Sequence, residues 1–288
     1  MTPPEMKGLA MSSPLIVVPL DGSHDAEVVL PFAQELAAAL PADLRLLHVL
    51  PPSEMGNDTL GRENLAFYMA RLDARCGLSA AQWLPPVTAG HPADAIIEAL
   101  AGASLLAIAS HGRGGFRAAT IGSVADRVIR ETPVPALFVP VTADAVPLAG
   151  RPVVAGLDTS EPSIHALTFA RSVAAALGSP VHLAEAYSVS ALLRGAAVGI
   201  DLLGIVRQNV EEYLGAATLP GETFAARRGA AHQILLEEAD RLDAAMIAVG
   251  TQGEGRTTRL LRGSTTDRLM HTSRRPLLIV PSPHTATA

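Results

Sequence analysis

Short runs of apolar residues alternate along the chain with longer stretches in which apolar and polar positions are mixed. Each run has the length and the Val, Leu and Ile content of a buried strand, and the stretches between them have the length of helices. The runs predict strands at 15–20, 43–50, 82–87, 105–109 and 135–139 in the first half, and at 153–157, 180–187, 223–227, 245–250 and 276–280 in the second. This alternation is typical of an α/β fold, a parallel sheet with helices on both faces.

The second half of the chain repeats the pattern of the first. Gly263 follows Gly122 at the same distance along the chain as Pro276 follows Pro135, so the offset between the halves is constant here. Loop insertions and deletions change the offset slightly elsewhere. A repeat of nearly half the chain length indicates two duplicated domains, because solenoid repeats are only about 20 to 50 residues long.

The repeat divides the chain into two domains joined by a short linker. Pro147, Gly150 and Pro152 punctuate a stretch without periodicity, which is typical of a linker. We therefore expect an N-terminal tail, a first domain, the linker, a second domain and a C-terminal tail at 1–13, 14–142, 143–151, 152–282 and 283–288.

Composition and charge argue against several classes of protein. Hydrophobic residues make up 49% of the chain and charged residues 17%, which indicates packed cores and not disorder. The net charge of -6 and the aromatic content of 3% offer neither a basic surface nor stacking side chains for nucleic acid. We expect no nucleic-acid partner.

The sequence also indicates a cytoplasmic protein without membrane contact. Cys76 is the one cysteine and cannot form an internal disulfide, which fits a reducing compartment. The segment 1–13 does not resemble a secretory signal. The apolar stretch 95–109 is shorter than the roughly 20 residues that a spanning helix needs.

Candidate chemistry lies after the first and fourth strands of each half. Asp21 and Asp158 follow the first strands, and glycine-containing loops follow the fourth. In a sheet of order 3-2-1-4-5 these strands flank the point where the order reverses, which is where ligands of doubly wound sheets bind. An aspartate there can bind a ribose hydroxyl or an adenine amino group. Glycine lets backbone N–H groups approach phosphate closely.

Each loop ends in a Gly-Ser pair before a helical run. These pairs are Gly122-Ser123 and Gly263-Ser264, and an aspartate lies three positions after each serine. Each serine is therefore well placed as an N-cap, and one alternative is that it only caps its helix. We favour a ligand role because a helix N-terminus, a glycine loop and an aspartate converge in both halves.

The pattern Gly-x-x-Gly, nine residues, Gly-Ser/Thr resembles the ATP-binding motif of the universal stress protein family. The resemblance covers residues 14–282 and implies two tandem Rossmann-like domains of the adenine nucleotide alpha hydrolase-like kind, each a five-stranded parallel sheet of order 3-2-1-4-5. It implies nucleotide contacts from Pro19, Asp21, Ala109, Gly112, Arg113, Gly122, Ser123 and Val124, and from Asp158, Gly250, Gly253, Gly263, Ser264 and Thr265.

Two departures from the motif make the sites nonequivalent. Ala109 replaces the first glycine in the first half, which is harmless in extended backbone but strained at positive φ. The second half keeps Gly250 but carries Glu254, whose charge disfavours phosphate unless a nearby arginine offsets it. We expect at least one site to hold ATP.

The resemblance implies an ATP-binding regulator of the stress response that acts through a protein partner. Mg²⁺ would arrive with the triphosphate, without a metal site or a catalytic residue from the protein. One alternative is a slow ATPase or phosphotransfer enzyme, although the chain has no Walker A lysine. We interpret His111 as a loop residue and not as a base for Ser110, because sequence neighbours rarely face each other. Another alternative is a scaffold that has lost one or both sites.

The resemblance also implies how the two domains pack. Domains of this family commonly associate through their last strands, so 135–140 and 276–281 are expected to meet as an intramolecular pseudo-dimer. Further pairing as a homodimer stays open.

Overall fold

The computed structural model describes residues 13–50, 59–78, 82–84, 87–88, 91–111, 121–187, 202–251 and 264–282. The first half contains β1 (Leu15–Leu20), α1 (His24–Glu27), α2 (Leu30–Ala39), β2 (Asp43–Leu50), α3 (Thr59–Cys76), β3 (Val87–Thr88), α4 (Pro92–Ala99), β4 (Leu105–Ala109), α5 (Ser123–Glu131) and β5 (Ala136–Val139). The second contains β6 (Val153–Leu157), α6 (Glu161–Ala176), β7 (Val181–Tyr187), α7 (Leu202–Ala217), β8 (Thr223–Arg228), α8 (Ala231–Arg241), β9 (Met246–Gly250), α9 (Ser264–Thr272) and β10 (Leu277–Val280). None of the helices in these ranges combines the length and apolar character needed to cross a membrane.

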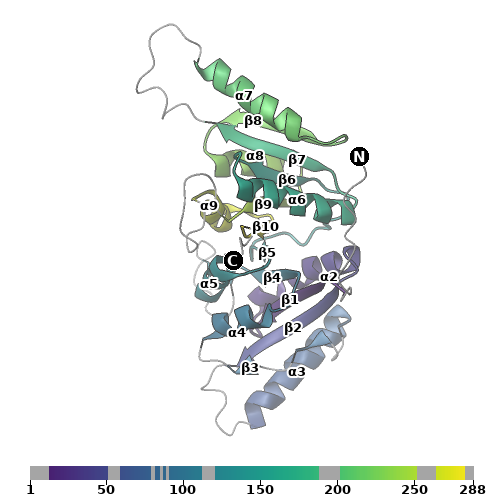
Figure 1. Ribbon diagram of the computed structural model, residues 1–288. Helices are drawn as coiled ribbons and strands as arrows, with labels where there is room; N and C mark the ends of the chain where they lie inside the picture. The colour runs from purple at the N-terminus through teal and green to yellow at the C-terminus, as the bar shows by residue number, and fades with distance from the viewer. Residues whose placement is uncertain are drawn as a thin grey trace, which may run out of the picture.

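The strands form one continuous sheet across both halves. Its order is β3-β2-β1-β4-β5-β10-β9-β6-β7-β8, so each half has the predicted order 3-2-1-4-5. Strands within each half pair in parallel, whereas β5 and β10 pair antiparallel, with Leu137 opposite Leu278. Figure 1 shows the two halves stacked, with β5 and β10 in the middle. The predicted α/β class is confirmed, and the two five-stranded sheets are joined into one.

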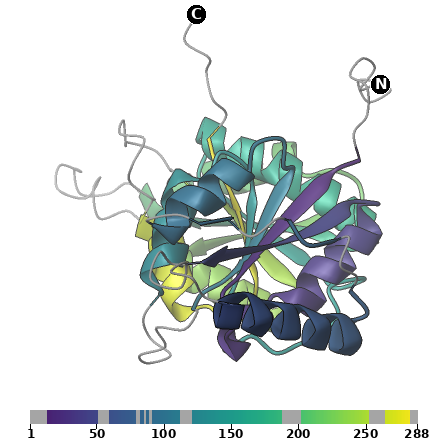
Figure 2. The same cartoon turned by 90° about the horizontal axis from the view of Figure 1, so that it is seen from below.

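Successive strand residues point to opposite faces of the sheet, and each face carries its own apolar layer. One layer contains buried residues of α2, α3, α6 and α7, and the other contains buried residues of α4, α5, α8 and α9. Figure 2 shows helices on both sides of the strands. At the β5–β10 seam, Leu137 and Leu278 belong to the first layer, and Phe138 and Leu277 to the second. Both layers are therefore continuous from one half to the other.

The third strand of the first half is shorter than the prediction of 82–87. Trp83 makes only an isolated bridge to Leu46, and β3 itself covers Val87–Thr88. Pro85 and Pro86 lie between them, and proline has no backbone N–H to donate to a sheet. The apolar run alone predicted a strand, but the prolines divide it.

The helix after the first strand differs between the two halves. α6 runs unbroken, whereas the first half has two short helices, α1 and α2, separated by Val28 and Val29. Pro31 stands at the start of α2. Proline cannot donate a hydrogen bond to the carbonyl four residues earlier, which interrupts a helix.

The segment between β5 and β6 is attached to both halves. The Glu35 carboxylate on α2 accepts the Leu148 N–H at 2.8 Å and the Ala149 N–H at 2.8 Å. Leu148 is buried, and the Gly150 N–H donates to the Leu177 carbonyl at 3.1 Å. Leu148 therefore anchors this segment between the halves, while most of its neighbours along the segment are exposed.

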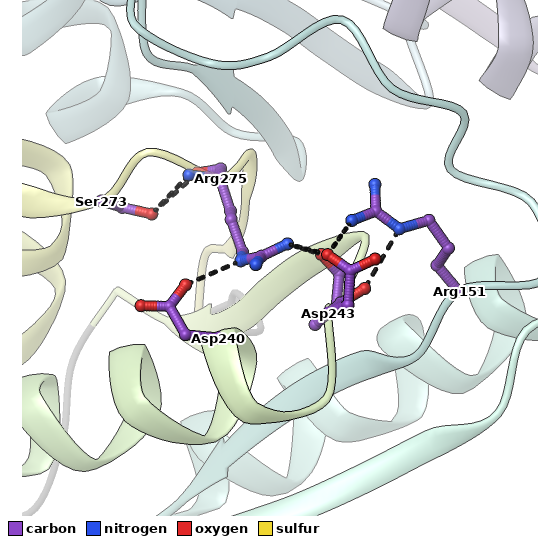
Figure 3. A network of polar contacts seen from close by, with 6 residues as sticks. Arg151, Asp240, Asp243, Ser273 and Arg275 are labelled. Atoms are coloured by element: carbon purple, nitrogen blue, oxygen red, sulfur yellow. Dashed lines mark hydrogen bonds and ion pairs between the residues drawn. The ribbon is translucent and has the colours of Figure 1, made fainter.

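Arginines fix the end of this segment to the second half (Figure 3). The Arg151 guanidinium donates to the Asp243 carbonyl at 3.1 Å and to its Oδ1 at 2.5 Å, and Arg275 donates to the same Oδ1 at 3.3 Å. These bonds lower the pKa of Asp243. Asp243 has a left-handed φ of 50°, and Gly102, its counterpart in the first half, has a φ of 79°. The tight turn is thus retained in both halves, by glycine in one and by an aspartate bound to two arginines in the other.

Candidate functional site

The first and fourth strands of each half separate toward their carboxyl ends. β1 pairs with β2 along its whole length, but with β4 only at Ile16 and Val17. In the second half, pairing of β6 with β9 stops at Ala155. The strands therefore separate where the strand order reverses, the position at which doubly wound sheets bind ligands. We call these positions the first and second strand-end sites.

Asp21 begins a turn that fixes the first strand-end site. Its Oδ1 accepts the Ser23 N–H at 2.9 Å and the Ser23 hydroxyl at 2.7 Å. The Ser23 oxygen in turn accepts the Ala26 N–H at 3.1 Å and so caps α1. Gly22 has a φ of 86°, a left-handed conformation that glycine adopts without strain. The position of the Asp21 carboxylate is thus set by the turn.

Asp158 holds the same turn in the second half. Its Oδ1 accepts the Ser160 N–H at 3.2 Å and the Ser160 hydroxyl at 2.5 Å, and Ser160 caps α6. Thr159 occupies the left-handed position with a φ of 63°, which costs a residue with a Cβ about 1 to 2 kcal/mol. The turn is retained despite that cost. The Asp-x-Ser spacing at both positions is the sequence signal for these caps.

Ser123 is not the N-cap of its helix, so the capping alternative is wrong for this residue. Gly122 is the N-cap of α5 and Ser123 is the first helical residue, so no side chain caps this helix. The Gly122 N–H donates to the Ser110 carbonyl at 2.8 Å, which holds the start of α5 against the end of β4. Ser123 is exposed. The first N–H groups of α5 have no partner within the helix and are suited to bind an anion.

The start of α9 is anchored by a different bond. α9 begins at Ser264, which is exposed, so this serine is also the first helical residue. The buried Thr266 hydroxyl donates to the Gly250 carbonyl at 2.8 Å. In each half, a hydrogen bond therefore joins the start of the helix before the fifth strand to the end of the fourth strand. The donor is a backbone N–H in the first half and a threonine hydroxyl in the second.

The difference between Ala109 and Gly250 has a steric cause. Neither residue has a positive φ. A Cβ added at Gly250 would lie 2.9 Å from the carbonyl oxygen of Pro162 in α6, closer than carbon and oxygen atoms pack. Ala109 is buried in β4, where the first half has the short helix α1 in place of the start of α6. Alanine is therefore accommodated in one half and excluded in the other.

We expect Gly250→Ala to lower the free energy of unfolding by about 1 to 3 kcal/mol, because the start of α6 must move to admit the methyl group. Gly215→Ala is the matched control. Gly215 lies in the last turn of α7, and its Cβ would meet only Phe224 of β8, at 4.0 Å, so the substitution should stabilise the protein by about 0.4 to 1 kcal/mol. Urea unfolding of both variants checks this prediction. Equal effects of the two substitutions would contradict it.

The other predicted site residues are placed as follows. Pro19 is buried in β1, and Val124 and Thr265 are the partly buried second residues of α5 and α9. Outside the described residues lie Gly112, Arg113, Gly253, Gly263 and Glu254.

Ser110 and His111 face each other, contrary to our prediction. The Ser110 Oγ lies 2.9 Å from the His111 Nδ1 and also accepts the Val141 N–H at 3.0 Å. Burial lowers the pKa of His111, and the Asp25 charge opposes that shift. Ser110 is 4% exposed, and the His111 Nε2 has no hydrogen-bond partner among the described residues, so none of their carboxylates orients the ring. Within that part of the chain the pair lacks the third group of a hydrolytic triad.

Each strand-end aspartate has a tyrosine near it that sequence reasoning missed. Burial raises the pKa of Tyr68, and the charges of Glu27 and Asp21 raise it further. Burial likewise raises the pKa of Tyr213, and Glu185 and Asp158 add to that effect. The tyrosines belong to α3 and α7, the corresponding helices of the two halves. Their sequence surroundings differ, which left no shared motif to detect.

Comparisons with known proteins agree with this geometry. The model of the universal stress protein family matches residues 15–140 and again 150–281. A universal stress protein from Archaeoglobus fulgidus DSM 4304 is 21% identical, with a TM-score of 0.70 over 95% of this chain and 100% of that chain. A functionally unknown protein from Pseudomonas aeruginosa PAO1 is 17% identical, with a TM-score of 0.69 over 94% of this chain and 93% of that one. These two likenesses show the fold.

A shorter universal stress protein, solved in complex with cAMP, is 26% identical over 47% of this chain and 99% of its own, with a TM-score of 0.33. Comparison with curated proteins gave no significant match.

Proposed function

The chain belongs to the universal stress protein family, and we propose that it binds ATP at its strand-end sites and acts as a nucleotide-dependent regulator of the stress response. One observation carries this proposal. In both halves an aspartate fixed by its own turn follows the first strand, and a helix whose first residue is an exposed serine follows the fourth. Packing alone does not require this combination twice.

The proposed roles follow from the chemistry of each group. Asp21 and Asp158 would accept hydrogen bonds from the ribose or from the adenine amino group, as charge-assisted acceptors. The starts of α5 and α9 would hold phosphate through backbone N–H groups and through the Ser123 and Ser264 hydroxyls. Mg²⁺ would come with the triphosphate and neutralise part of its charge. In the cell, we place this protein in the cytoplasm, where a change in ATP would be passed to a protein partner.

Thermal melting with and without ATP tests binding at these sites. At a concentration 100 times the dissociation constant, ATP should stabilise the native protein by about 2.7 kcal/mol. Asp21→Asn combined with Asp158→Asn should lower the affinity for ATP at least about tenfold, since hydrogen bonds to charged groups contribute roughly 1.5 to 3 kcal/mol. Asparagine keeps an oxygen that can accept the bonds from Ser23 and Ser160, so stability without ATP should change little.

Glu63→Ala is the control for that pair of substitutions, because Glu63 is an exposed carboxylate on α3. The control should melt and respond to ATP as the wild type does. No stabilisation of the wild type by ATP, ADP or AMP would contradict the proposal and favour a scaffold.

The enzyme alternative is tested separately. Release of phosphate from ATP that survives repeated purification and disappears in the Ser123→Ala, Ser264→Ala double variant would favour an ATPase. Binding without turnover is the result that the regulator proposal predicts, because no carboxylate of the described residues orients the His111 ring beside the Ser110 hydroxyl.

A further inference from the structure

The strand β8 forms one edge of the sheet, and among the strands that the structure describes it pairs only with β7 (Figure 1). Its six side chains are all exposed or partly buried. The opposite edge is different, because β3 has only two residues and follows Pro85 and Pro86. Short strands and prolines are common means by which proteins prevent sheet edges from pairing. β8 has neither, so it is the edge that can accept a further strand.

The pairing of β8 with β7 determines which of its backbone groups point outward. The Gly229 N–H, directly after β8, donates to the Tyr187 carbonyl of β7 at 3.2 Å. Backbone groups alternate in direction along a strand, so the odd-numbered residues of β8 face β7. The three N–H and three C=O groups of Phe224, Ala226 and Arg228 therefore point away from the sheet, and they have no hydrogen-bond partner in the part of the chain that the structure describes.

Exposed apolar side chains are concentrated in the unit formed by α7 and β8. Six large apolar side chains are exposed among the described residues, and three of them belong to this unit. They are Ile205 on α7, Leu219 in the turn after α7, and Phe224 on β8, which is 41% exposed. Arg228 is also exposed and makes no ion pair in the described ranges. Apolar surface beside an unpaired strand indicates a contact with another protein chain.

One antiparallel register pairs all of the outward groups of β8 with those of a second β8. A two-fold axis at Ala226 places this residue opposite its own copy, and Phe224 opposite Arg228. Residues that face each other in this way exchange two hydrogen bonds in each pair. We propose that β8 pairs antiparallel with β8 of a second copy of this chain, with the two-fold axis at Ala226.

The neighbouring registers are less favourable. An axis at Ala225 would place Arg228 opposite Glu222, whose N–H already donates to the Leu219 carbonyl at 3.0 Å. An axis at Arg227 would place two arginines directly opposite each other, and like charges in that position are destabilising. The backbone and the charges therefore select the same register.

The side chains on one face of the sheet agree with this register. Phe224 pairs with Leu183, which belongs to the apolar layer of α7, so Phe224, Ala226 and Arg228 lie on that face. The Arg228 guanidinium would lie over the Phe224 ring of the second copy, and the two-fold axis produces this cation–π contact twice. The small Ala226 side chain leaves space at the axis.

The helices beside β8 also permit this pairing. α7 packs against both β7 and β8. With strands roughly 4.8 Å apart, the two copies of α7 would lie about 10 Å from each other, which is a distance at which helices pack. The two chains would then share one sheet, and the proposal does not depend on ATP binding.

Sedimentation equilibrium of the full chain, over a range of protein concentrations, tests the proposal. We expect a monomer–dimer equilibrium with a dissociation constant on the order of 1 to 100 µM, the strength of a small interface. Ala226→Pro should lower the affinity at least about 100-fold, because it removes the N–H groups of the central pair in both copies. Ala226→Ser keeps the N–H and is the matched control, which should dimerise as the wild type does.

The proline variant should keep its fold, because the N–H that it lacks points to solvent in the monomer. Circular dichroism and thermal melting at low protein concentration check this. A wild type that stays monomeric at every concentration would overturn the proposal. A dimer of unchanged affinity in a folded Ala226→Pro variant would also overturn it.

Cysteine cross-linking tests the register, in a Cys76→Ala background because Cys76 is the one native cysteine. Hydrogen-bonded residues that face each other across antiparallel strands have Cα atoms about 5.5 Å apart, within the range of a disulfide. Ala226→Cys should therefore give a disulfide-linked dimer with oxidised glutathione. Ala225→Cys is the control, since its two Cα atoms would lie more than about 7 Å apart in this register. Cross-linking of Ala225→Cys in place of Ala226→Cys would overturn the proposed pairing.

Discussion

Phe138→Ala lowers the free energy of unfolding by about 3 to 5 kcal/mol, the range for removing a fully buried phenylalanine. Phe138 is 0% exposed and lies on β5 opposite Leu277 of β10, in an apolar layer that continues through both halves. The cavity therefore forms at the seam itself. We expect the two halves to unfold together in one transition, because both apolar layers continue across the seam between β5 and β10.

Two probes in one urea titration check that expectation. Trp83 is the one tryptophan and is buried in the first half, so its fluorescence reports that half, whereas circular dichroism reports both. The fluorescence and dichroism unfolding curves should coincide, and Phe138→Ala should move both to lower urea concentration by the same amount. Phe67→Ala is the control, since Phe67 is 74% exposed and its loss should change stability by no more than about 0.5 kcal/mol. A dichroism transition that stays in place while fluorescence shifts would show that the halves unfold separately.

Glu238→Ala should lower the free energy of unfolding by about 3 kcal/mol, near the lower end of the roughly 3 to 5 kcal/mol that removing one partner of a buried ion pair usually costs. Glu238 is 2% exposed, and its carboxylate accepts bonds from Arg227 at 2.9 Å and from Arg241 at 2.8 Å. We expect a cost near the lower end of this range because both arginines are about half exposed, so water can solvate their guanidinium groups when the carboxylate is removed. Glu237→Ala is the matched control, an exposed neighbour 3.2 Å from Arg227 that should cost under about 1 kcal/mol.

The same cluster predicts how stability falls in acid. Burial raises the pKa of Glu238, but bonds from Arg241 and Arg227 outweigh it and lower the pKa below 4.5. Burial lowers the pKa of His182, which lies 3.4 Å from the same carboxylate. The unfolded chain therefore takes up protons first in both cases, so stability falls below pH 6.5 through His182 and again below pH 4.5 through Glu238.

Unfolding of the wild type and of Glu238→Ala between neutral pH and about pH 3.5 measures this dependence. The variant should lose less stability below about pH 4.5 than the wild type, because the carboxylate that must be protonated is gone. Equal slopes in that range would show that Glu238 does not contribute to the acid sensitivity.

Sequence patterns predicted the architecture well because strands and repeats are encoded locally. The runs around Val17 and Ile108 predicted β1 and β4, and the family resemblance implied the pairing of β5 with β10. The break at Pro31 and the short β3 depend on missing N–H groups within otherwise apolar runs, which periodicity does not weigh.

The site was harder to predict because its geometry depends on contacts distant in sequence. Gly250 is required by the backbone of Pro162, and Ser110 is held by the Val141 N–H. Neither contact follows from a motif. The position after the first strand identified Asp21 as a candidate and the glycine pattern identified Ser123, and their role in binding stays a prediction.

Calorimetric titration of ATP into protein stripped of bound nucleotide tests the central claim most directly. We predict saturable heat, at least one site for each chain, and weaker binding in the Asp21→Asn, Asp158→Asn variant. Absence of heat, together with no adenine nucleotide released when the freshly purified protein is denatured, would contradict it.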